Sequence, residues 1–216
     1  MHNTVQNLIN IKNKIKETNK SYNVIKIIAV SKTFCLGKIS PLIDYGHLDY
    51  GENKVQEAFE KWSEIKAKKP DIKLHLIGGL QTNKVKFAIS LFDYIHSLDS
   101  TKLAKKIADE ELKQSKKIKI FIQVNLGNEE QKSGIRLEKL DELYKYAIKL
   151  NLNIIGLMCI PPVSEDASLY FNQLKLHNKR LGLKELSMGM SGDFIKAIEN
   201  DATFIRVGSN IFGSRY

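Results

Sequence analysis

The sequence has little cysteine and no long apolar run. These absences argue against a cysteine metal or redox site, a secretory signal and a membrane-spanning segment. Its two cysteines, Cys35 and Cys159, form no metal or redox spacing, which favours a reducing, cytoplasmic compartment. The first twenty residues contain no continuous apolar segment, so no secretory signal is predicted. The longest mostly apolar stretch, "IIGLMCIPPV", is too short and too rich in proline to span a bilayer. We therefore expect a soluble cytoplasmic protein without a membrane partner.

The chain is basic, but its positively charged residues do not form a recognisable binding motif. The net charge is +10, and a basic balance by itself is compatible with nucleic-acid binding. The lysines are however spread along the chain and interleaved with acids, as in "EKWSEIKAKK", which is typical of the solvated faces of amphipathic helices. No cluster of aromatic and basic residues resembles an RNA-binding motif. Nucleic acid is not an expected partner; salt-dependent retention on RNA or duplex DNA would test that alternative.

Short β-rich runs alternate with helical patterns from one end of the chain to the other. No linker rich in glycine or serine divides it, so residues 1–216 are expected to form a single domain. Apolar residues at spacings of three and four predict helices over residues 4–19 and 55–65. Eight strands are predicted, at residues 24–30, 47–53, 72–78, 93–98, 116–124, 153–160, 184–189 and 203–208.

Eight strands with helices between them form either an open doubly wound sheet or a closed barrel. No G-x-G-x-x-G motif follows the first strand, so a Rossmann half is not indicated. Eight strands in about two hundred residues suit a barrel. The prediction is an α/β fold, a (β/α)8 TIM barrel preceded by one extra N-terminal helix. In such barrels the chemistry gathers at the C-terminal ends of the strands.

Two small-residue turns follow the last two predicted strands. The first, "MSGDFIKAIE", places Ser191 as the expected N-cap of a helix with Asp193 in its first turn, and a plain capped helix would explain it. In the second, "RVGSNIFG", Gly208 and Ser209 offer backbone N–H groups to an anion. Barrels often bind phosphate between these two loops. A phosphorylated ligand is the resulting hypothesis.

A lysine and an arginine stand at strand ends that face this predicted anion site. Lys32 shares strand parity with Ile28 and Val30, so its side chain is expected to point inward at the barrel mouth. Burial lowers the pKa of a lysine and makes a nucleophilic neutral amine available. Arg206 suits a partner for a pyridine nitrogen, and a guanidinium only donates hydrogen bonds, leaving that nitrogen unprotonated. Amine, anion site and arginine together describe a pocket for pyridoxal 5'-phosphate (PLP).

The chain resembles the pyridoxal phosphate homeostasis proteins, single-domain relatives of the alanine racemase barrel. The likeness runs from about residue 25 to the end, through "AVSKTF", "YGENKVQEA", "HLIGGLQTNK", "IHSLDS", "QVNLGNEEQKSGI", "GLMCIPP", "LSMGMSGDFIKAI" and "IRVGSNIFG". The resemblance implies a Schiff base between PLP and Lys32. It also implies cofactor contacts from Asn53, Met190, Ser191, Arg206, Gly208 and Ser209. Met158 either walls the ring or simply packs in the barrel.

The resemblance further implies a carrier rather than an enzyme. It indicates a protein of intracellular PLP homeostasis, which buffers and delivers the cofactor and affects amino-acid and keto-acid balance, with PLP-dependent apo-enzymes as possible recipients. The racemase relatives carry a second domain with an opposing tyrosine base, whereas this chain ends soon after the eighth predicted strand. One base gives only one side of a two-base racemisation. A small PLP-dependent amino-acid racemase is the alternative. A monomer is expected, since no exposed apolar helix stripe is predicted.

Overall fold

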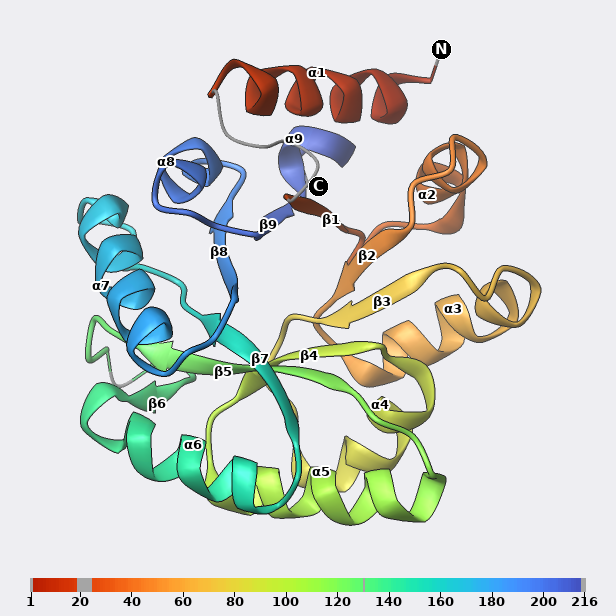
Figure 1. Ribbon diagram of the computed structural model, residues 1–216. Coiled ribbons are helices and arrows are strands. Elements are labelled where there is room, and N and C mark those ends of the chain that lie inside the picture. The colour runs from red at the N-terminus through yellow and green to blue at the C-terminus, as the bar shows by residue number, and fades with distance from the viewer. Residues whose placement is uncertain (1, 19–24, 130, 215–216) are drawn as a thin grey trace.

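Parallel strands form a closed barrel in the computed structural model, which describes residues 2–18, 25–129 and 131–214 (Figure 1). Each strand pairs with the next along the chain, and the last pairs with the first. This confirms the predicted (β/α)8 barrel; Val24, predicted in the first strand, lies outside the described residues. The eight barrel strands are β1 (Lys26–Val30), β2 (Asp49–Glu52), β3 (Lys73–Leu76), β4 (Tyr94–Leu98), β5 (Lys119–Asn125), β7 (Asn153–Met158), β8 (Glu185–Met190) and β9 (Phe204–Val207).

One short strand was not predicted. β6 (Ile135–Arg136) pairs in parallel with the end of β5, at Val124 and Asn125, outside the ring of eight. A two-residue strand leaves no alternation of apolar and polar residues for a sequence pattern to detect. β6 holds the loop after β5 against the C-terminal end of the barrel.

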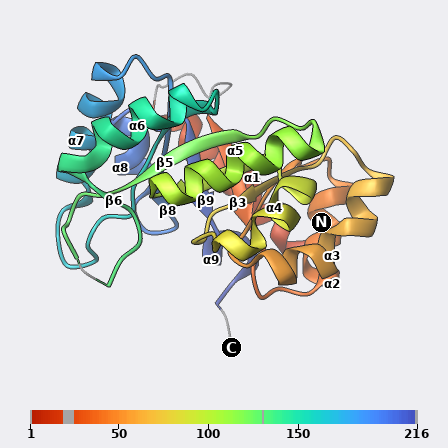
Figure 2. The same ribbon diagram turned by 90° about the horizontal axis from the view of Figure 1, so that it is seen from below.

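Helices lie outside the strands in both views (Figure 1, Figure 2). The predicted extra helix is α1, which packs beside α9, where the Asn7 amide donates to the carbonyl of Ile211 at 3.0 Å. Within the described parts of the chain, no helix is long and apolar enough to cross a membrane. The helical elements are α1 (Asn3–Glu17), α2 (Leu36–Asp44), α3 (Val55–Lys68), η2 (Thr82–Lys84), α4 (Val85–Leu91), α5 (Thr101–Gln114), η3 (Leu137–Lys139), α6 (Leu140–Lys149), α7 (Ala167–Arg180), α8 (Phe194–Glu199) and α9 (Ser209–Phe212).

Alternation along the strands separates two buried regions. On β5, Ile120 and Ile122 face the helices and join the large outer core, whereas Phe121 points into the barrel. The interior cluster of the barrel consists of Ile28, Tyr94, Phe121, Met158 and Phe204. Side chains thus fill the barrel interior up to the C-terminal ends of the strands. Residues just beyond these ends lie around the open mouth of the barrel.

The interior cluster should carry a large share of the stability. Phe121 is fully buried and its ring centroid lies 5.1 Å from that of Phe204 in an edge-on contact. We expect Phe121→Ala to lower the free energy of unfolding by about 3–5 kcal/mol, because the barrel cannot collapse around the lost ring. Leu112, which is 83% exposed, is the control, and Leu112→Ala should stay within about 0.5 kcal/mol. Urea unfolding followed by circular dichroism measures both, and equal effects would contradict this account of the core.

Candidate functional site

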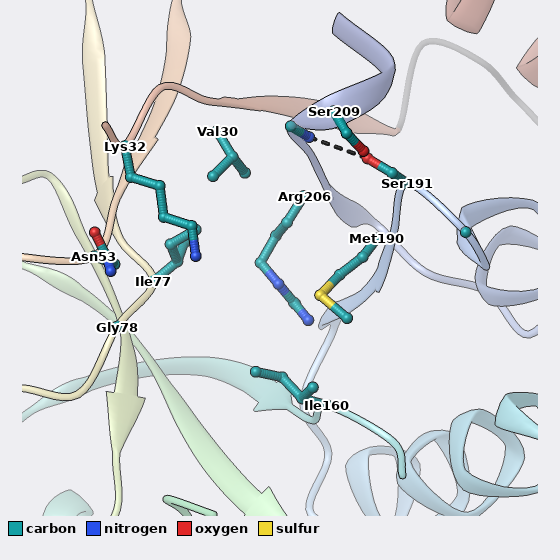
Figure 3. Close-up of a pocket in the computed structure, with 12 residues that line it drawn as sticks. Val30, Lys32, Asn53, Ile77, Gly78, Ile160, Met190, Ser191, Arg206 and Ser209 are labelled. Carbon is teal, nitrogen blue, oxygen red and sulfur yellow. Dashed lines mark hydrogen bonds between the residues drawn. The ribbon is translucent and has the colours of Figure 1, made fainter. Parts of the chain in front are cut away.

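A pocket of about 660 Å³ opens at the C-terminal ends of the strands, and the seven residues predicted to contact the cofactor all line it (Figure 3). Lys32 and Arg206 extend into the same space, with Asn53 on the Lys32 side and Met190 and Ser191 on the Arg206 side. Five further lining residues were not predicted, namely Val30, Ile77, Gly78, Ile160 and Gly192. The structure thus brings the predicted residues together, while their roles toward a ligand stay predictions.

Lys32 lies two residues after the end of β1, and its placement agrees with the parity argument. Ile28 belongs to the barrel interior and Val30 lines the pocket, so every second residue from Ile28 faces inward. Lys32 is half-buried and lines the same pocket. Ser31, of the opposite parity, is fully buried and points away toward β2. Alternation therefore delivers Lys32 to the pocket.

A buried carboxylate anchors the chain just before Lys32. Glu52 is fully buried at the end of β2, and its Oε1 accepts hydrogen bonds from the Ser31 hydroxyl at 2.7 Å and the Trp62 indole at 2.9 Å. The Lys61 ammonium lies 3.0 Å from the same oxygen and also donates to the carbonyl of Ser31 at 3.0 Å. A buried charge is tolerated where it is paired and hydrogen-bonded. Both the side chain and the backbone of Ser31 are therefore fixed.

A second carboxylate anchors the chain just after Lys32. Thr33 has a φ of 68°, a left-handed conformation that is a genuine outlier for a β-branched residue. Its backbone N–H donates to Glu57 Oε1 at 2.6 Å, and Lys61 lies 2.9 Å from that oxygen. Burial raises the pKa of Glu57, but the Thr33 and Lys61 hydrogen bonds outweigh it and lower the pKa below its ordinary value. Glu52, Lys61 and Glu57, hereafter the clamp, thus hold both neighbours of Lys32.

Arg206 brings a buried cation to the pocket. It is 4% exposed, on β9, and its two terminal nitrogens donate to Ser187 Oγ at 2.7 Å and to the carbonyl of Cys159 at 2.9 Å. Burial lowers the pKa of Arg206, but a guanidinium stays charged in proteins. Arg206 can only donate hydrogen bonds to a ligand.

Ser191 joins the two loops that were predicted to hold an anion, but it does not cap α8. The prediction of Ser191 as N-cap is wrong: α8 begins at Phe194, with Asp193 in the capping position. The carboxylate of Asp193 instead accepts the N–H of Met190 at 2.5 Å. Ser191 Oγ accepts the N–H groups of Gly208 at 3.3 Å and Asn210 at 3.4 Å. The loop after β8 is thereby fixed against the loop after β9.

Asn53 supplies an unused acceptor at the opposite wall. Its Oδ1 is buried and has no hydrogen-bond partner among the described residues. Gly78 allows this arrangement, since a Cβ there would lie 2.3 Å from the carbonyl oxygen of Asn53. A buried polar atom without a partner costs free energy unless a ligand or water satisfies it. With the hydroxyls of Ser191 and Ser209, the pocket thus presents a set of polar groups that fits a phosphorylated, ring-containing ligand.

Met158, the two cysteines and the clamp complete the comparison between the sequence predictions and the structure. Met158 does not line the pocket but lies in the barrel interior, so its packing role applies, and Ile160 forms that wall. Cys35 is exposed, whereas Cys159 is buried, and burial raises the pKa of its thiol to about 12. The clamp residues were missed because their importance depends on contacts between elements, although Glu52 stands inside the motif that contains Asn53.

Comparison with known proteins places this chain in a family. Residues 5–216 match the family model described as alanine racemase, N-terminal domain. A pyridoxal phosphate homeostasis protein of Aquifex aeolicus (strain VF5) is 39% identical, covering 95% of this chain and 93% of its own length. The protein of the same name from Escherichia coli (strain K12) is 34% identical, over 100% and 98% of the two chains.

Solved structures agree with these relatives. PipY of Synechococcus elongatus PCC7942, solved with PLP bound, is 32% identical and has a TM-score of 0.87, covering 97% of this chain and all (100%) of its own. An alanine racemase of Clostridium difficile 630 has a TM-score of 0.71 at 15% identity, with coverage of 99% of this chain and 57% of the racemase. At that identity the likeness concerns the fold alone.

The clamp should be visible as coupling between its charges. We expect Lys61→Met to lower the free energy of unfolding by about 3 kcal/mol, because it leaves the buried Glu52 carboxylate without its cation. Adding Glu52→Gln should restore most of that loss, since the charge itself is then gone. The exposed pair of Lys105 and Asp109 provides the control, and Lys105→Met should produce no measurable change. Urea unfolding of the wild type, of Lys61→Met, Glu52→Gln and their double variant, and of Lys105→Met measures the coupling, and additive effects of the Lys61 and Glu52 substitutions would refute the clamp.

Proposed function

Since the chain belongs to the pyridoxal phosphate homeostasis proteins, which share the N-terminal barrel of alanine racemase, we propose that it binds PLP at the mouth of the barrel and serves intracellular PLP homeostasis. Its relative PipY has been solved with PLP bound. The observation that carries the proposal is the pocket in which Lys32, Arg206 and Ser191 face one space. Residues 1–216 act as a single PLP-binding domain in this proposal.

Each lining residue has a distinct task toward the cofactor. When bound, PLP supplies an aldehyde for covalent attachment and an electron-withdrawing ring. Lys32 is the attachment residue, held in place by the clamp on both sides. The hydroxyls of Ser191 and Ser209 and the backbone N–H groups that follow Met190 and Gly208 bind the phosphate. Arg206 donates to the pyridine nitrogen, and Asn53 offers its free Oδ1 to the ring substituents.

The same pocket lacks the second base that catalytic racemisation requires. Among the twelve residues that line it, all within the described part of the chain, only Lys32 and Arg206 have titratable side chains. Reversible proton transfer at both faces of an amino acid needs two bases, and Arg206 stays protonated and cannot act as one. A guanidinium beside the pyridine nitrogen also keeps the ring a weak electron sink. The protein therefore holds PLP without appreciable catalysis.

The proposed carrier role has consequences for access to the pocket, for the cellular compartment and for the oligomeric state. The pocket opens to solvent at the barrel mouth, so PLP-dependent apo-enzymes have access to the cofactor as recipients. Both cysteines are free thiols, in keeping with a reducing cytoplasm. The protein acts as a monomer in this proposal, because a carrier needs no partner subunit to complete the pocket described above.

Attachment to Lys32 is tested by colour and by mass. Wild-type protein incubated with PLP should absorb visible light, and borohydride reduction followed by peptide mapping should place the pyridoxyl group on Lys32. Lys32→Ala should lose the band, because the amine that forms the covalent bond is absent. Lys102→Ala, which changes an exposed lysine of α5, should keep it. A colourless wild type, or a label on another lysine, would overturn the assignment.

The racemase alternative is separated by a rate measurement. PLP-loaded protein should not interconvert L- and D-alanine at rates above those of free PLP, because a second base is missing from the pocket. Chiral chromatography of alanine and a panel of other amino acids measures this, with a known alanine racemase as positive control. Cofactor-dependent racemisation at enzyme-like rates, of about 1 s⁻¹ or more, would establish the alternative.

A further inference from the structure

Beneath the pocket, five polar side chains cross the barrel in an unbroken chain of hydrogen bonds. Arg206 on β9 donates to Ser187 Oγ on β8 at 2.7 Å. Ser187 Oγ lies 2.8 Å from Nδ1 of His96 on β4, and His96 Nε2 lies 3.0 Å from Nδ1 of His75 on β3. His75 Nε2 lies 3.0 Å from Oδ1 of Asp49, the first residue of β2. The chain thus links the pocket to the opposite, N-terminal end of the barrel.

The two histidines are enclosed by the aromatic interior. His75 stacks on Tyr94 with 4.2 Å between ring centroids, and His96 stacks on Phe121 at 4.4 Å. Both histidines are fully buried. Burial lowers the pKa of each below its ordinary value, so both are neutral at pH 7. A neutral imidazole has one donor nitrogen and one acceptor nitrogen.

These facts fix the direction of every hydrogen bond. Burial raises the pKa of Asp49, but the hydrogen bond from His75 outweighs it and lowers the pKa below its ordinary value, so Asp49 is ionised and only accepts. His75 Nε2 must then donate, which leaves its Nδ1 as acceptor for His96 Nε2. His96 Nδ1 is in turn an acceptor, so the Ser187 hydroxyl donates to it and accepts from Arg206. Each of the four hydrogen bonds in the chain then joins one donor to one acceptor, and every donor points from the guanidinium toward the carboxylate.

We infer that Ser187, His96, His75 and Asp49 are positioning residues for Arg206, and that Asp49 controls the cofactor's ring contact from the far end of the barrel. This inference rests on the proposed PLP site. Hydrogen bonds in series polarise one another, and a carboxylate at the end strengthens the acceptor that Ser187 presents to Arg206. Ser187 and the carbonyl of Cys159 then hold both terminal nitrogens of the guanidinium.

The hydrogen positions can be tested without any cofactor. In wild-type protein labelled with ¹⁵N-histidine, long-range ¹H–¹⁵N correlations should show His75 and His96 both neutral and both protonated at Nε2. This readout distinguishes a directed chain from simple packing, which would not dictate the tautomer. A ring protonated at Nδ1, or at both nitrogens, would overturn the inference for the wild type irrespective of any variant.

Asp49→Asn tests the control of Arg206. The amide removes the charge and offers an N–H to His75, so the tautomers of both histidines should shift toward Nδ1–H. The dissociation constant for PLP, from an absorbance titration, should rise at least about fivefold, the lower range of coupling between separate sites. Asp49→Glu should recover most of the affinity because the carboxylate acceptor returns. Asp71→Asn, at an exposed aspartate, is the matched control and should leave both readouts unchanged.

The two proposals fail in different ways. If Asp49→Asn binds PLP within fivefold of the wild type and keeps both Nε2–H tautomers, the inference is wrong while the PLP site stands. If wild-type protein does not bind PLP, the proposed function is wrong, and the tautomer measurement still decides whether the directed chain exists. Circular dichroism of each variant ensures that only folded protein is compared.

Discussion

The pairing of the first strand with the last is the constraint on which the site depends. β1 lies parallel to β9 with Ile28 opposite Arg206 and Ala29 opposite Val207. This register places the residues after β1, including Lys32, beside the loop that contains Gly208 and Ser209. Residues separated by nearly the whole chain therefore share one pocket. A slip of one residue would turn Lys32 away from the barrel mouth, because side chains alternate along a strand.

Buried charge is the second organising feature, and each of the buried charged side chains named here makes defined hydrogen bonds. Glu52 and Lys61 form a pair whose hydrogen bonds fix Ser31. Arg206 and Asp49 stand at the two ends of a chain of neutral groups. Burying such groups is costly unless their hydrogen-bonding capacity is filled. The protein retains them where they set the geometry of Lys32 and Arg206, and apolar packing fills the interior around them.

The proposed role as a carrier follows from what surrounds the lysine. In this proposal a covalent tether, a phosphate-binding pair of loops and a fixed cation hold PLP, while the described lining of the pocket offers no second base. Attachment without turnover protects a reactive aldehyde while leaving it retrievable. In this proposal the barrel that the chain shares with racemases serves another role, in accordance with the rule that folds do not determine chemistry.

The sequence by itself determined the barrel, the position of Lys32 just beyond the first strand, and the two loops with Ser191 and Ser209. These features depend on local periodicity and on the rule that the C-terminal ends of parallel strands meet at one face of a barrel. It did not determine that Ser191 would accept hydrogen bonds from the loop after β9 instead of capping α8, nor that Met158 would be interior. The clamp and the chain from Arg206 to Asp49 were decided only by the tertiary structure. Their members lie up to 157 residues apart in the numbering, from Asp49 to Arg206, and only barrel closure brings such residues into hydrogen-bonding distance.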